Sequence, residues 1–333
     1  MKAAVIGAGF CGLAVAWHLL QRFSSQSDFS LTLFDSRGIG QGTSGIAAGL
    51  LHPFSGAHAK LNWRGIEGMQ ATQELLETAS LALGRPVAAK NQGILRLALT
   101  AEQQSDFQLS AKLNPESIQW LDAHSCQKLA PGSTFAPGLW IKEGLTVYSS
   151  LYLQGLWQAC AGRGALFENR SVDSLHKLGK EGYDLTIVAT GAETPQIEEF
   201  ASLPLKVVKG QVLELAWPHD TLPLSCSLNS QIYLLMGEKG LSCLAGSTYE
   251  KEFLDARPDL ETAKKEILPK LYALFPPLEG AAILNCSAGL RAVGPQHRPL
   301  IKQISPAQWI ITGMGSKGLL YHALFAKELV ESI

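Results

Sequence analysis

Three glycines, at positions 7, 9 and 12, follow a short apolar run at the start of the chain. The run, Lys2 to Ile6, has the character of a buried strand, and Leu13 to Phe23 has the apolar spacing of a helix. A strand, a glycine turn and a helix in this order are typical of a dinucleotide-binding βα unit. There the first glycine makes the tight turn, the second lets the backbone approach a pyrophosphate, and the third lets helix and strand pack closely.

An acidic residue, Asp35, lies at the end of the second predicted strand, where a dinucleotide-binding unit has its ribose-binding acid. The next apolar run begins at Ser30 and ends in Asp35, which lies 23 residues after Gly12. An acid about 20 residues after the third glycine binds a ribose hydroxyl in these folds. The combination predicts a dinucleotide whose phosphates lie at the positive N-terminus of the helix. A glycine-rich turn in some other α/β fold is the structural alternative.

The apolar start could also belong to a signal peptide or a membrane span. Only Lys2 precedes the run, and Gln21 and Arg22 interrupt it without a cleavage signal. Inside a single membrane helix each of the three glycines would cost about 1 kcal/mol relative to alanine. We therefore expect neither a signal peptide nor a membrane span.

Length, charge and cysteine pattern narrow the class of protein. A chain of 333 residues is long enough for two domains, each with its own core. Its net charge of −1 provides no global field for nucleic acid, which argues against a nucleic-acid partner. The six cysteines are scattered, with no CxxC pair and no histidine at metal-ligand spacing. This pattern predicts reduced thiols, a cytoplasmic location and no metal site.

Further pieces of the cofactor domain are spread along the chain. Gly40 to Phe54 is rich in glycine and alanine, which lets a flat ring and phosphates lie against the backbone. Leu185 to Ala189 has the character of a buried strand, and Trp309 to Thr312 is a second one, followed by a glycine loop and a helix. We predict a discontinuous cofactor domain that consists of residues 1–85, 145–202 and 283–333.

The two intervening stretches, 86–144 and 203–282, have a different pattern. Runs that alternate between polar and apolar residues predict a mostly antiparallel sheet, and they are Gly210–Trp217, Gln231–Met236 and Leu241–Glu250. We expect this second domain to hold the substrate over the cofactor. The predicted fold class is α/β, with a Rossmann-like domain joined to a mostly antiparallel β-sheet (α+β) substrate domain.

A set of motifs along nearly the whole chain resembles the D-amino-acid oxidase (DAO) superfamily of FAD-dependent amine oxidoreductases. In order, the motifs are GAGFCG, GTSGIAAG, ENRSVDSL, VATGAET, KGQVLEL, GLRAVGPQHRPL and GMGSKG. Within the superfamily they are most similar to glycine oxidase and to the oxidase domain of the bifunctional tRNA wobble-uridine methylaminomethyl enzyme. The resemblance implies a glutathione-reductase-type FAD-binding domain, FAD as the cofactor, and an amine or amino acid as the substrate.

The resemblance also implies residues for cofactor binding. Asp35 would hold the adenosine ribose, where the family more often has Glu, and Thr43 and Ser44 would donate to the pyrophosphate. Val172 would meet the adenine through its backbone, and Ala47 to Leu50 would line the flavin ring. The complete predicted set is Gly7, Ala8, Gly9, Phe10, Cys11, Gly12, Asp35, Ser36, Thr43, Ser44, Ala47, Ala48, Gly49, Leu50, Val172, Thr190, Gly191, Arg291, Gly315, Ser316, Lys317, Gly318 and Leu319.

The glycine loop Gly313 to Gly318 has a predicted electrostatic use. Reduced flavin carries negative charge near N1 and the C2 carbonyl. A helix that starts near Gly318 would direct its N–H groups and its dipole at that charge. Lys317 would add a cation, and the alternative is a solvated lysine at a helix start.

Three residues are candidates for the catalytic site. Arg291 matches the family arginine that clamps a substrate carboxylate, a task that suits a planar guanidinium because it can bind both oxygens. Tyr233 occupies the family's tyrosine position ahead of a strand, although Met236 replaces the usual proline. His52 either faces the flavin or satisfies a core carbonyl. A structural ion pair is the alternative for Arg291, and a core position is the alternative for Tyr233.

Beside Arg291 the chain departs from the family pattern. Family members commonly have proline after the arginine and an acid or glycine a few residues later, whereas this chain has Ala292, Gln296 and His297. The departure leaves the carboxylate clamp in place as a prediction and leaves the substrate open.

Together these features predict a flavoenzyme that oxidises the C–N bond of a small amino acid or secondary amine, with O₂ as acceptor. Hydride transfer to flavin N5 gives an imine that water hydrolyses, and no general base is needed when the amine arrives uncharged. One alternative is a dehydrogenase that passes electrons to a quinone or other carrier. Others are an oxidase that acts on carboxymethylaminomethyl-uridine in tRNA and a flavin-binding module without catalysis.

Overall fold

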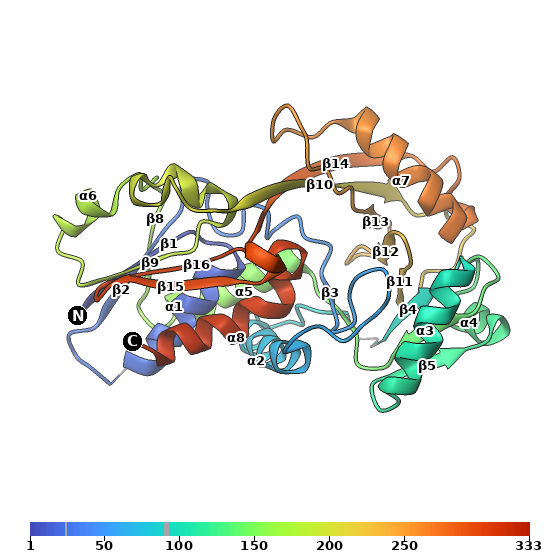
Figure 1. Cartoon of the computed structure of the whole chain (residues 1–333), viewed down its shortest axis with the longest axis horizontal. Coiled ribbons are helices and arrows are strands. Elements are labelled where there is room, and N and C mark those ends of the chain that lie inside the picture. The colour runs from blue at the N-terminus through green and yellow to red at the C-terminus, as the bar shows by residue number, and fades with distance from the viewer. Residues whose placement is uncertain (24, 90–92) are drawn as a thin grey trace.

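The computed structural model describes residues 1–23, 25–89 and 93–333 and contains two large β-sheets (Figure 1). Both chain termini lie beside the six-stranded sheet, at one end of an elongated molecule. The eight-stranded sheet forms the other end. Two long strands, β10 (Lys206–Ala216) and β14 (Ile283–Val293), form one edge of this sheet and extend toward the six-stranded sheet.

The six-stranded sheet joins segments from the start, middle and end of the sequence. In spatial order its strands are β15 (Leu300–Ser305), β16 (Gln308–Thr312), β9 (Leu185–Val188), β1 (Lys2–Ile6), β2 (Ser30–Phe34) and β8 (Leu166–Glu168). All neighbours pair in parallel except β15 and β16. A parallel sheet with β1 near its centre is the arrangement expected of a nucleotide-binding fold.

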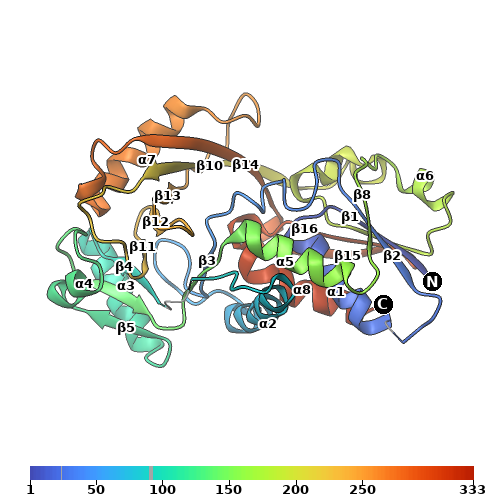
Figure 2. The ribbon, with the colours of Figure 1, turned by 180° about the vertical axis from the view of Figure 1, so that it is seen from behind.

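Both faces of this sheet are buried, which accounts for the continuous apolar runs of its strands. Alternate residues of β1 enter two different cores: Ala3 and Val5 on one face, Ala4 and Ile6 on the other. The first face packs on α1 (Phe10–Phe23), α2 (Gly65–Leu83), α5 (Ser149–Ala161) and α8 (Gly318–Glu331). Figure 2 shows α1, α2 and α5 in front of the strands. The second face packs on α6 (Leu175–Gly179) and on Ile197 and Phe200, which lie between and within the 3-10 segments η1 (Gly191–Gln196) and η2 (Glu198–Phe200).

The eight-stranded sheet is mostly antiparallel, as the alternating runs predict. In spatial order its strands are β14, β10, β13 (Ser242–Gly246), β12 (Tyr233–Met236), β11 (Ser227–Asn229), β4 (Ile94–Leu97), β6 (Gly138–Ile141) and β5 (Ile118–Leu121). Only β11 and β4 pair in parallel. A separate two-stranded ladder joins β3 (Leu50–Leu51) to β7 (Leu145–Thr146).

Helix α7 (Leu260–Leu274) covers one face of the long strands. Leu213 and Leu215 of β10 share a buried cluster with Ile267 and Leu271 of α7. Burial of a side chain of this size stabilises the fold by about 1.5 to 3 kcal/mol. At the far end of the sheet, α3 (Ala101–Leu113) buries Phe107 against β4, β5 and β6, and α4 (Ala123–Leu129) follows β5.

Strand β14 lies in a different sheet from the strands that follow it in the predicted segment 283–333. The sequence assigned residues 283–333 to the cofactor domain, but Ile283–Val293 pairs with β10 in the eight-stranded sheet. After Gly294 the chain enters β15 of the other sheet, and a bridge joins Val293 to Met314. We propose Gly294 as the boundary. The sequence missed it because an apolar run does not reveal which strand it will pair with.

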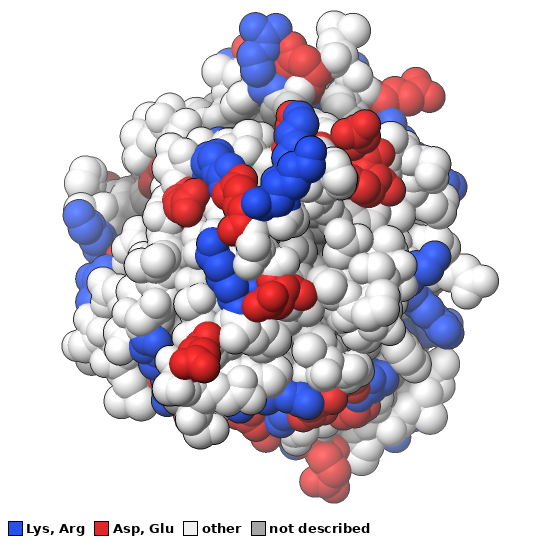
Figure 3. Space-filling model, turned by 90° about the vertical axis from the view of Figure 1, so that its left-hand side faces the viewer, with Lys and Arg blue, Asp and Glu red and all other residues white. Residues whose placement is uncertain are grey.

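Each apolar or alternating run contains a strand, but the bounds differ by up to four residues: Gly210–Trp217 overlaps β10 (Lys206–Ala216), and only Ser242–Gly246 of Leu241–Glu250 is a strand. Strand β1 has its predicted bounds, and α1 starts at Phe10 rather than Leu13. All six cysteines are free. No helix in the described part of the chain is long and apolar enough to cross a bilayer. Figure 3 shows acidic and basic side chains interspersed on the face at the six-stranded end.

Candidate active site

The glycine turn lies at the carboxyl end of β1 and opens α1. Gly7 has φ 105°, in the region that favours glycine, and its N–H donates to Phe34 O at 2.7 Å. A Cβ on Gly12 would overlap the Gly7 carbonyl, so only glycine allows helix and strand to approach this closely. Ala8 and Phe10 are buried, and burial raises the pKa of the Cys11 thiol to about 12.

Ser44 packs against the start of α1. A Cβ on Gly9 would lie 2.7 Å from Ser44 Oγ, and the Phe10 N–H donates to the same oxygen at 3.1 Å. Ser44 therefore caps an N–H group at the helix start and retains a hydroxyl proton that can be donated to an anion. This contact brings the segment after β2 against the positive end of the helix.

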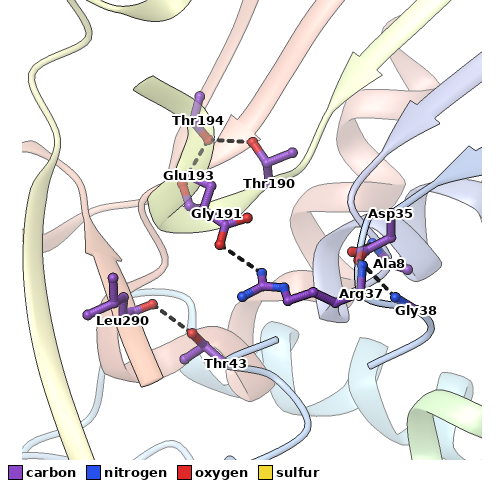
Figure 4. A network of polar contacts seen from close by, with 10 residues as sticks. All are labelled: Ala8, Asp35, Arg37, Gly38, Thr43, Thr190, Gly191, Glu193, Thr194 and Leu290. Atoms are coloured by element: carbon purple, nitrogen blue, oxygen red, sulfur yellow. Dashed lines mark hydrogen bonds and ion pairs between the residues drawn. The ribbon is translucent and has the colours of Figure 1, made fainter. Parts of the chain in front are cut away.

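Asp35 is held at the end of β2 by backbone N–H groups (Figure 4). Its Oδ2 accepts from Ala8 N at 2.9 Å, and its Oδ1 accepts from Arg37 N at 2.8 Å and Gly38 N at 3.2 Å. A carboxylate has about four acceptor positions, so it can still accept from a ribose hydroxyl. These bonds fix the carboxylate beside the glycine turn.

An ion pair that the sequence analysis did not identify spans the same region. Arg37 Nη2 lies 2.9 Å from Glu193 Oε1, which joins the loop after β2 to η1 (Figure 4). In η1 the Gly191 carbonyl accepts from Thr194 Oγ1 at 2.7 Å and from Thr312 Oγ1 at 3.0 Å. The only sequence signal for Arg37 was its position two residues after Asp35.

Other predicted cofactor residues are distributed around this region. Thr43 Oγ1 donates to Leu290 O at 2.9 Å, so its predicted bond to the pyrophosphate requires that bond to be exchanged. Gly49 has φ 82°, and a Cβ there would overlap the Val147 carbonyl. Ala47, Ala48 and Leu50 beside it are half-buried, as is Val172, whereas Ser36 and Ser316 are exposed and Leu319 is buried. Thr190 Oγ1 lies 3.1 Å from Thr194 Oγ1.

The C-terminal glycine loop leads into α8 as expected. Gly313 and Gly315 have φ 76° and 59°, and α8 begins at Gly318 without a side-chain cap on its first turn. Lys317 is half-buried, and burial lowers its pKa. A Cβ on Gly318 would lie 3.7 Å from the Phe10 ring, so the starts of α8 and α1 are adjacent. Two neighbouring helix N-termini suit a ligand that carries negative charge.

Arg291 and Tyr233 both have Ser247, the residue after β13, as a neighbour. Arg291 Nη2 donates to Ser247 Oγ at 2.8 Å, and Nη1 donates to Thr248 O at 3.3 Å. The Ser247 hydroxyl also lies close enough to Tyr233 to act on the pKa of its phenol. Both side chains need glycine beside them, because a Cβ on Gly210 would overlap the Arg291 guanidinium. A Cβ on Gly246 would likewise lie 2.6 Å from the Tyr233 hydroxyl oxygen, which is too close. No sequence signal indicated Ser247.

The electrostatics of this pair suit an anionic ligand. Burial lowers the pKa of Arg291 and raises the pKa of Tyr233 to about 12, so the arginine is charged and the phenol is neutral near pH 7. Among the described residues no carboxylate lies within 4 Å of the Arg291 guanidinium. A half-buried arginine without an ion-pair partner favours a ligand carboxylate over the structural alternative.

His52 follows β3 and is buried. Its Nδ1 accepts from Phe54 N at 3.2 Å, and burial lowers its pKa to about 3, with Arg96 as a second cause. The ring is therefore neutral with its proton on Nε2. Arg96 itself is 2% exposed and donates to Phe54 O and Gly56 O, both at 2.7 Å. This arrangement favours a positioning role for His52, and its predicted place in the catalytic site stays a prediction.

A pocket of about 390 Å³ lies farther along the same sheet face, and neither Arg291 nor Tyr233 belongs to its lining. One wall is formed by segments 45–48 and 147–151, and the first of these is predicted to line the flavin. The other wall is the sheet, through Val212, Glu214, Leu235, Leu244, Asn285 and Ser287. Val212 and Ser287 lie in the same cross-strand row as Gly246, which pairs with Tyr233.

The structure also groups His58 with Glu102 and Asp106, their ligand atoms within 4.8 Å of one another. His58 and Glu102 are exposed, and His58 Nδ1 pairs with Asp106 at 2.6 Å. Sequence spacing did not indicate this group, because α3 brings the acids to a loop more than 40 residues earlier. We assign it no role beyond an ion pair.

A parallel sheet with a glycine turn, an acid at the end of its second strand, and an arginine-bearing sheet alongside define a two-domain nucleotide-binding oxidoreductase fold. The family model described as "FAD dependent oxidoreductase" (DAO) matches residues 2–332. The chain belongs to this family of FAD-dependent oxidoreductases, as its motifs predict.

Two kinds of curated relative are similar to this chain. The tRNA 5-methylaminomethyl-2-thiouridine biosynthesis bifunctional protein of Hydrogenovibrio crunogenus is 26% identical over an alignment that covers 93% of this chain and 48% of the relative. The glycine oxidase of Bacillus licheniformis is 24% identical, with 89% of this chain and 82% of the relative covered. The chain thus spans about half the length of the bifunctional relatives.

Solved structures confirm the predicted fold class. Glycine oxidase from Geobacillus kaustophilus superposes with a TM-score of 0.83 at 20% identity and covers 99% of this chain and 95% of its own. L-proline dehydrogenase from P. horikoshii has a TM-score of 0.81 at 19% identity, with 99% and 92% covered. The FAD-bound L-alpha-glycerophosphate oxidase from Mycoplasma pneumoniae has a TM-score of 0.76 at 17% identity, with 99% and 93% covered.

Proposed function

We propose that this chain binds FAD across the starts of α1 and α8 and oxidises the C–N bond of a small amino acid or secondary amine. The observation that carries the proposal is Arg291, which is half-buried beside Tyr233 and has no carboxylate partner among the described residues. The family is FAD-dependent, which supports the cofactor.

The residues at the glycine turn fit FAD. Asp35 is fixed where it can accept from the adenosine ribose, and Ser44 can donate to the pyrophosphate. The uncapped start of α8 and the cation of Lys317 would stabilise negative charge on the flavin. Bound FAD supplies a hydride acceptor at flavin N5, which no amino-acid side chain can provide.

Arg291 and Tyr233 would orient the substrate. A guanidinium has five N–H donors, and only two bonds to protein acceptors are present, so a substrate carboxylate can be bound by the others. The neutral Tyr233 hydroxyl can donate to the same carboxylate. These contacts would place the α-carbon at a fixed position and keep water away from it.

The overall reaction balances without a protein general base. The α-carbon of an uncharged amine would give up a hydride, which bound FAD would accept, the nitrogen would release a proton to solvent, and water would hydrolyse the imine. With O₂ as acceptor, the two electrons together with two protons would yield hydrogen peroxide. A dehydrogenase would instead pass them to a quinone or another carrier.

A second candidate substrate is a carboxymethylaminomethyl-uridine in tRNA. It is favoured by the relatives that are named for tRNA 5-methylaminomethyl-2-thiouridine biosynthesis and align with most of this chain. The modified base carries a glycine-like secondary amine with a carboxylate, so the same arginine could bind it.

The test is anaerobic reduction of the bound flavin, followed by absorbance near the flavin maximum. The panel contains glycine, sarcosine, larger D- and L-amino acids, and tRNA that carries the carboxymethylaminomethyl group. Reduction by at least one amine that bears a carboxylate is expected, and dithionite serves as the positive control. If dithionite reduces the flavin but no member of the panel does, the proposal is ruled out. Reduction by the tRNA alone would select the second candidate.

A further inference from the structure

The sheet face that carries Arg291 also carries an acidic residue, which lines the pocket. Arg291 is paired with Val208 of β10, and its guanidinium lies over Gly210. Four residues farther along β10 is Glu214, which points to the same face because side chains alternate along a strand. Glu214 pairs across the sheet with Asn285 and lines the pocket.

Glu214 has no positive partner. Its Oε1 accepts from Ser242 Oγ at 2.7 Å, and in the described part of the chain no cation lies within 4 Å of it. The pocket lining contains no lysine or arginine. The other acid there, Glu238, is exposed and pairs with Arg85 at 2.9 Å. Glu214, which is half-buried, is therefore the uncompensated negative charge of the pocket.

The region between the two charged ends is apolar. Val212, Leu235 and Leu244 lie on this face of the sheet and line the pocket, and none of them carries a polar side-chain atom. A chain of methylene groups would bury its surface against them, which stabilises binding by about 0.8 kcal/mol for each fully buried CH₂. The face thus presents a cation, an apolar strip and an anion in line.

The spacing sets the length of the ligand. A strand rises about 3.3 Å per residue and its side chains stand roughly perpendicular to the sheet, so the guanidinium over Gly210 and the Glu214 side chain are separated by about 13 Å along β10. A carboxylate and an ammonium joined by six bonds of about 1.5 Å span about 7 Å when extended. Contacts of about 3 Å at each end bring the total to about 13 Å. A lysine-length zwitterion matches this distance.

We propose that the substrate is an amino acid or N-substituted amino acid whose far end carries a cation, and that Glu214 selects it. This inference rests on the proposed function, because the substrate carboxylate is the group that Arg291 binds. Glycine and sarcosine would then be short substrates that leave the Glu214 end of the pocket filled with water.

The first test uses two unreactive probes of matched length, 6-aminohexanoate and hexanoate, titrated calorimetrically into the FAD-loaded protein. We expect 6-aminohexanoate to bind about tenfold more tightly, since an ion pair with a half-buried carboxylate is only partly screened. In Glu214→Gln the Ser242 bond is retained and the preference should fall to about twofold or less. Glu279→Gln, an exposed acid away from the pocket, should keep it.

A charge-reversal variant provides the second test. Glu214→Lys should bind hexanedioate more tightly than 6-aminohexanoate, which a merely structural glutamate would not produce. Lysine should also reduce the flavin faster than its neutral analogue norleucine in the parent, and this difference should vanish in Glu214→Gln. The inference would be overturned if the parent bound 6-aminohexanoate and hexanoate equally. It would also be overturned if the preference for 6-aminohexanoate were unchanged in both Glu214→Gln and Glu214→Lys. If sarcosine or norleucine still reduces the flavin in that case, the proposed function stands.

Discussion

Arg291 Nη2 donates to Ser247 Oγ at 2.8 Å, and this bond sets the direction of the guanidinium on the sheet face. The Ser247 hydroxyl also acts on the pKa of Tyr233, so the two candidate substrate residues have one neighbour in common. The glycines at 210 and 246 leave room for these two side chains. The positions of Arg291 and Tyr233 therefore depend on residues of neighbouring strands, not only on the residues next to them in the sequence.

We predict that Arg291→Met keeps FAD and the fold but weakens flavin reduction by amino acids. Loss of one partner of a buried charge pair costs about 2 to 5 kcal/mol, which corresponds to a loss of about 30- to 5,000-fold in affinity, and flavin reduction should weaken by at least about tenfold. Arg291→Lys should recover part of the loss, because a point charge replaces a bidentate fork. Stopped-flow reduction measures the effect, and dithionite reduction should be unchanged.

The control for this prediction is Arg163→Met, which removes an exposed arginine on the far helical layer. Amino acids should reduce the flavin of this variant at the same rate as that of the parent protein. If Arg291→Met reduces as fast as the parent with every carboxylate substrate, Arg291 has a structural role only.

Gly9→Val should yield protein without FAD. The new side chain would meet Ser44 Oγ, displace it from the Phe10 N–H and occupy the approach to the helix start. Gly179→Val is the matched control, because nothing lies within 4 Å of a Cβ at that position. The FAD content after denaturation, read by absorbance, decides the outcome. Full occupancy in Gly9→Val would contradict a phosphate site at this turn.

Asp35→Asn should lower both stability and FAD affinity. The carboxylate accepts three backbone N–H groups, whereas an asparagine amide has one acceptor oxygen and turns its NH₂ toward a donor. The unsatisfied donors should cost about 1 to 3 kcal/mol of unfolding free energy. We expect the Kd for FAD to rise by about tenfold. Asp220→Asn, at an exposed position, should change neither quantity.

Stability should fall as the pH decreases below the ordinary histidine pKa. Burial lowers the pKa of His52 and His322 to about 3 and that of His18 to about 4. Between these values and about 6.5 the unfolded chain binds more protons than the folded one, so acid favours unfolding. The Asn side chain in His52→Asn can still accept from Phe54 N. Between pH 7 and pH 5 the free energy of unfolding of this variant should fall by about 2 kcal/mol less than that of the parent.

Urea unfolding at the two pH values, at saturating FAD, measures this difference. His219→Asn is the control, since that side chain is exposed. An identical pH dependence in parent and His52→Asn would show that His52 is not a buried neutral histidine in the folded protein.

The reduced enzyme should be reoxidised by air within seconds and form one hydrogen peroxide per substrate oxidised. The expectation follows from the proposed oxidase reaction, in which O₂ takes both electrons. A peroxidase-coupled assay together with substrate depletion measures the ratio. Slow reoxidation in air combined with fast turnover with a quinone analogue would identify a dehydrogenase.

Features that depend on a few neighbouring residues could be predicted from the sequence. The strand Lys2–Ile6, the turn at Gly7 and the following helix are fixed by apolar spacing and by a backbone conformation that favours glycine. The position of Asp35 after the second strand followed from spacing alone. Arg291 and Tyr233 could be named through motif resemblance, but Ser247, which binds Arg291, could not.

The amino-acid pattern is thus sufficient for the cofactor half, which is a glycine turn between a strand and a helix, with an acid at the end of the next strand. The pairing of β14 with β10, the contact of Arg291 with Ser247 and the alignment of Glu214 with that arginine arise only when the chain is folded. The difference lies in the range of the interactions. Turns and helices are stabilised by contacts within a few residues, whereas sheet register is chosen among strands distant in sequence, and a shift of one residue would turn Glu214 to the opposite face.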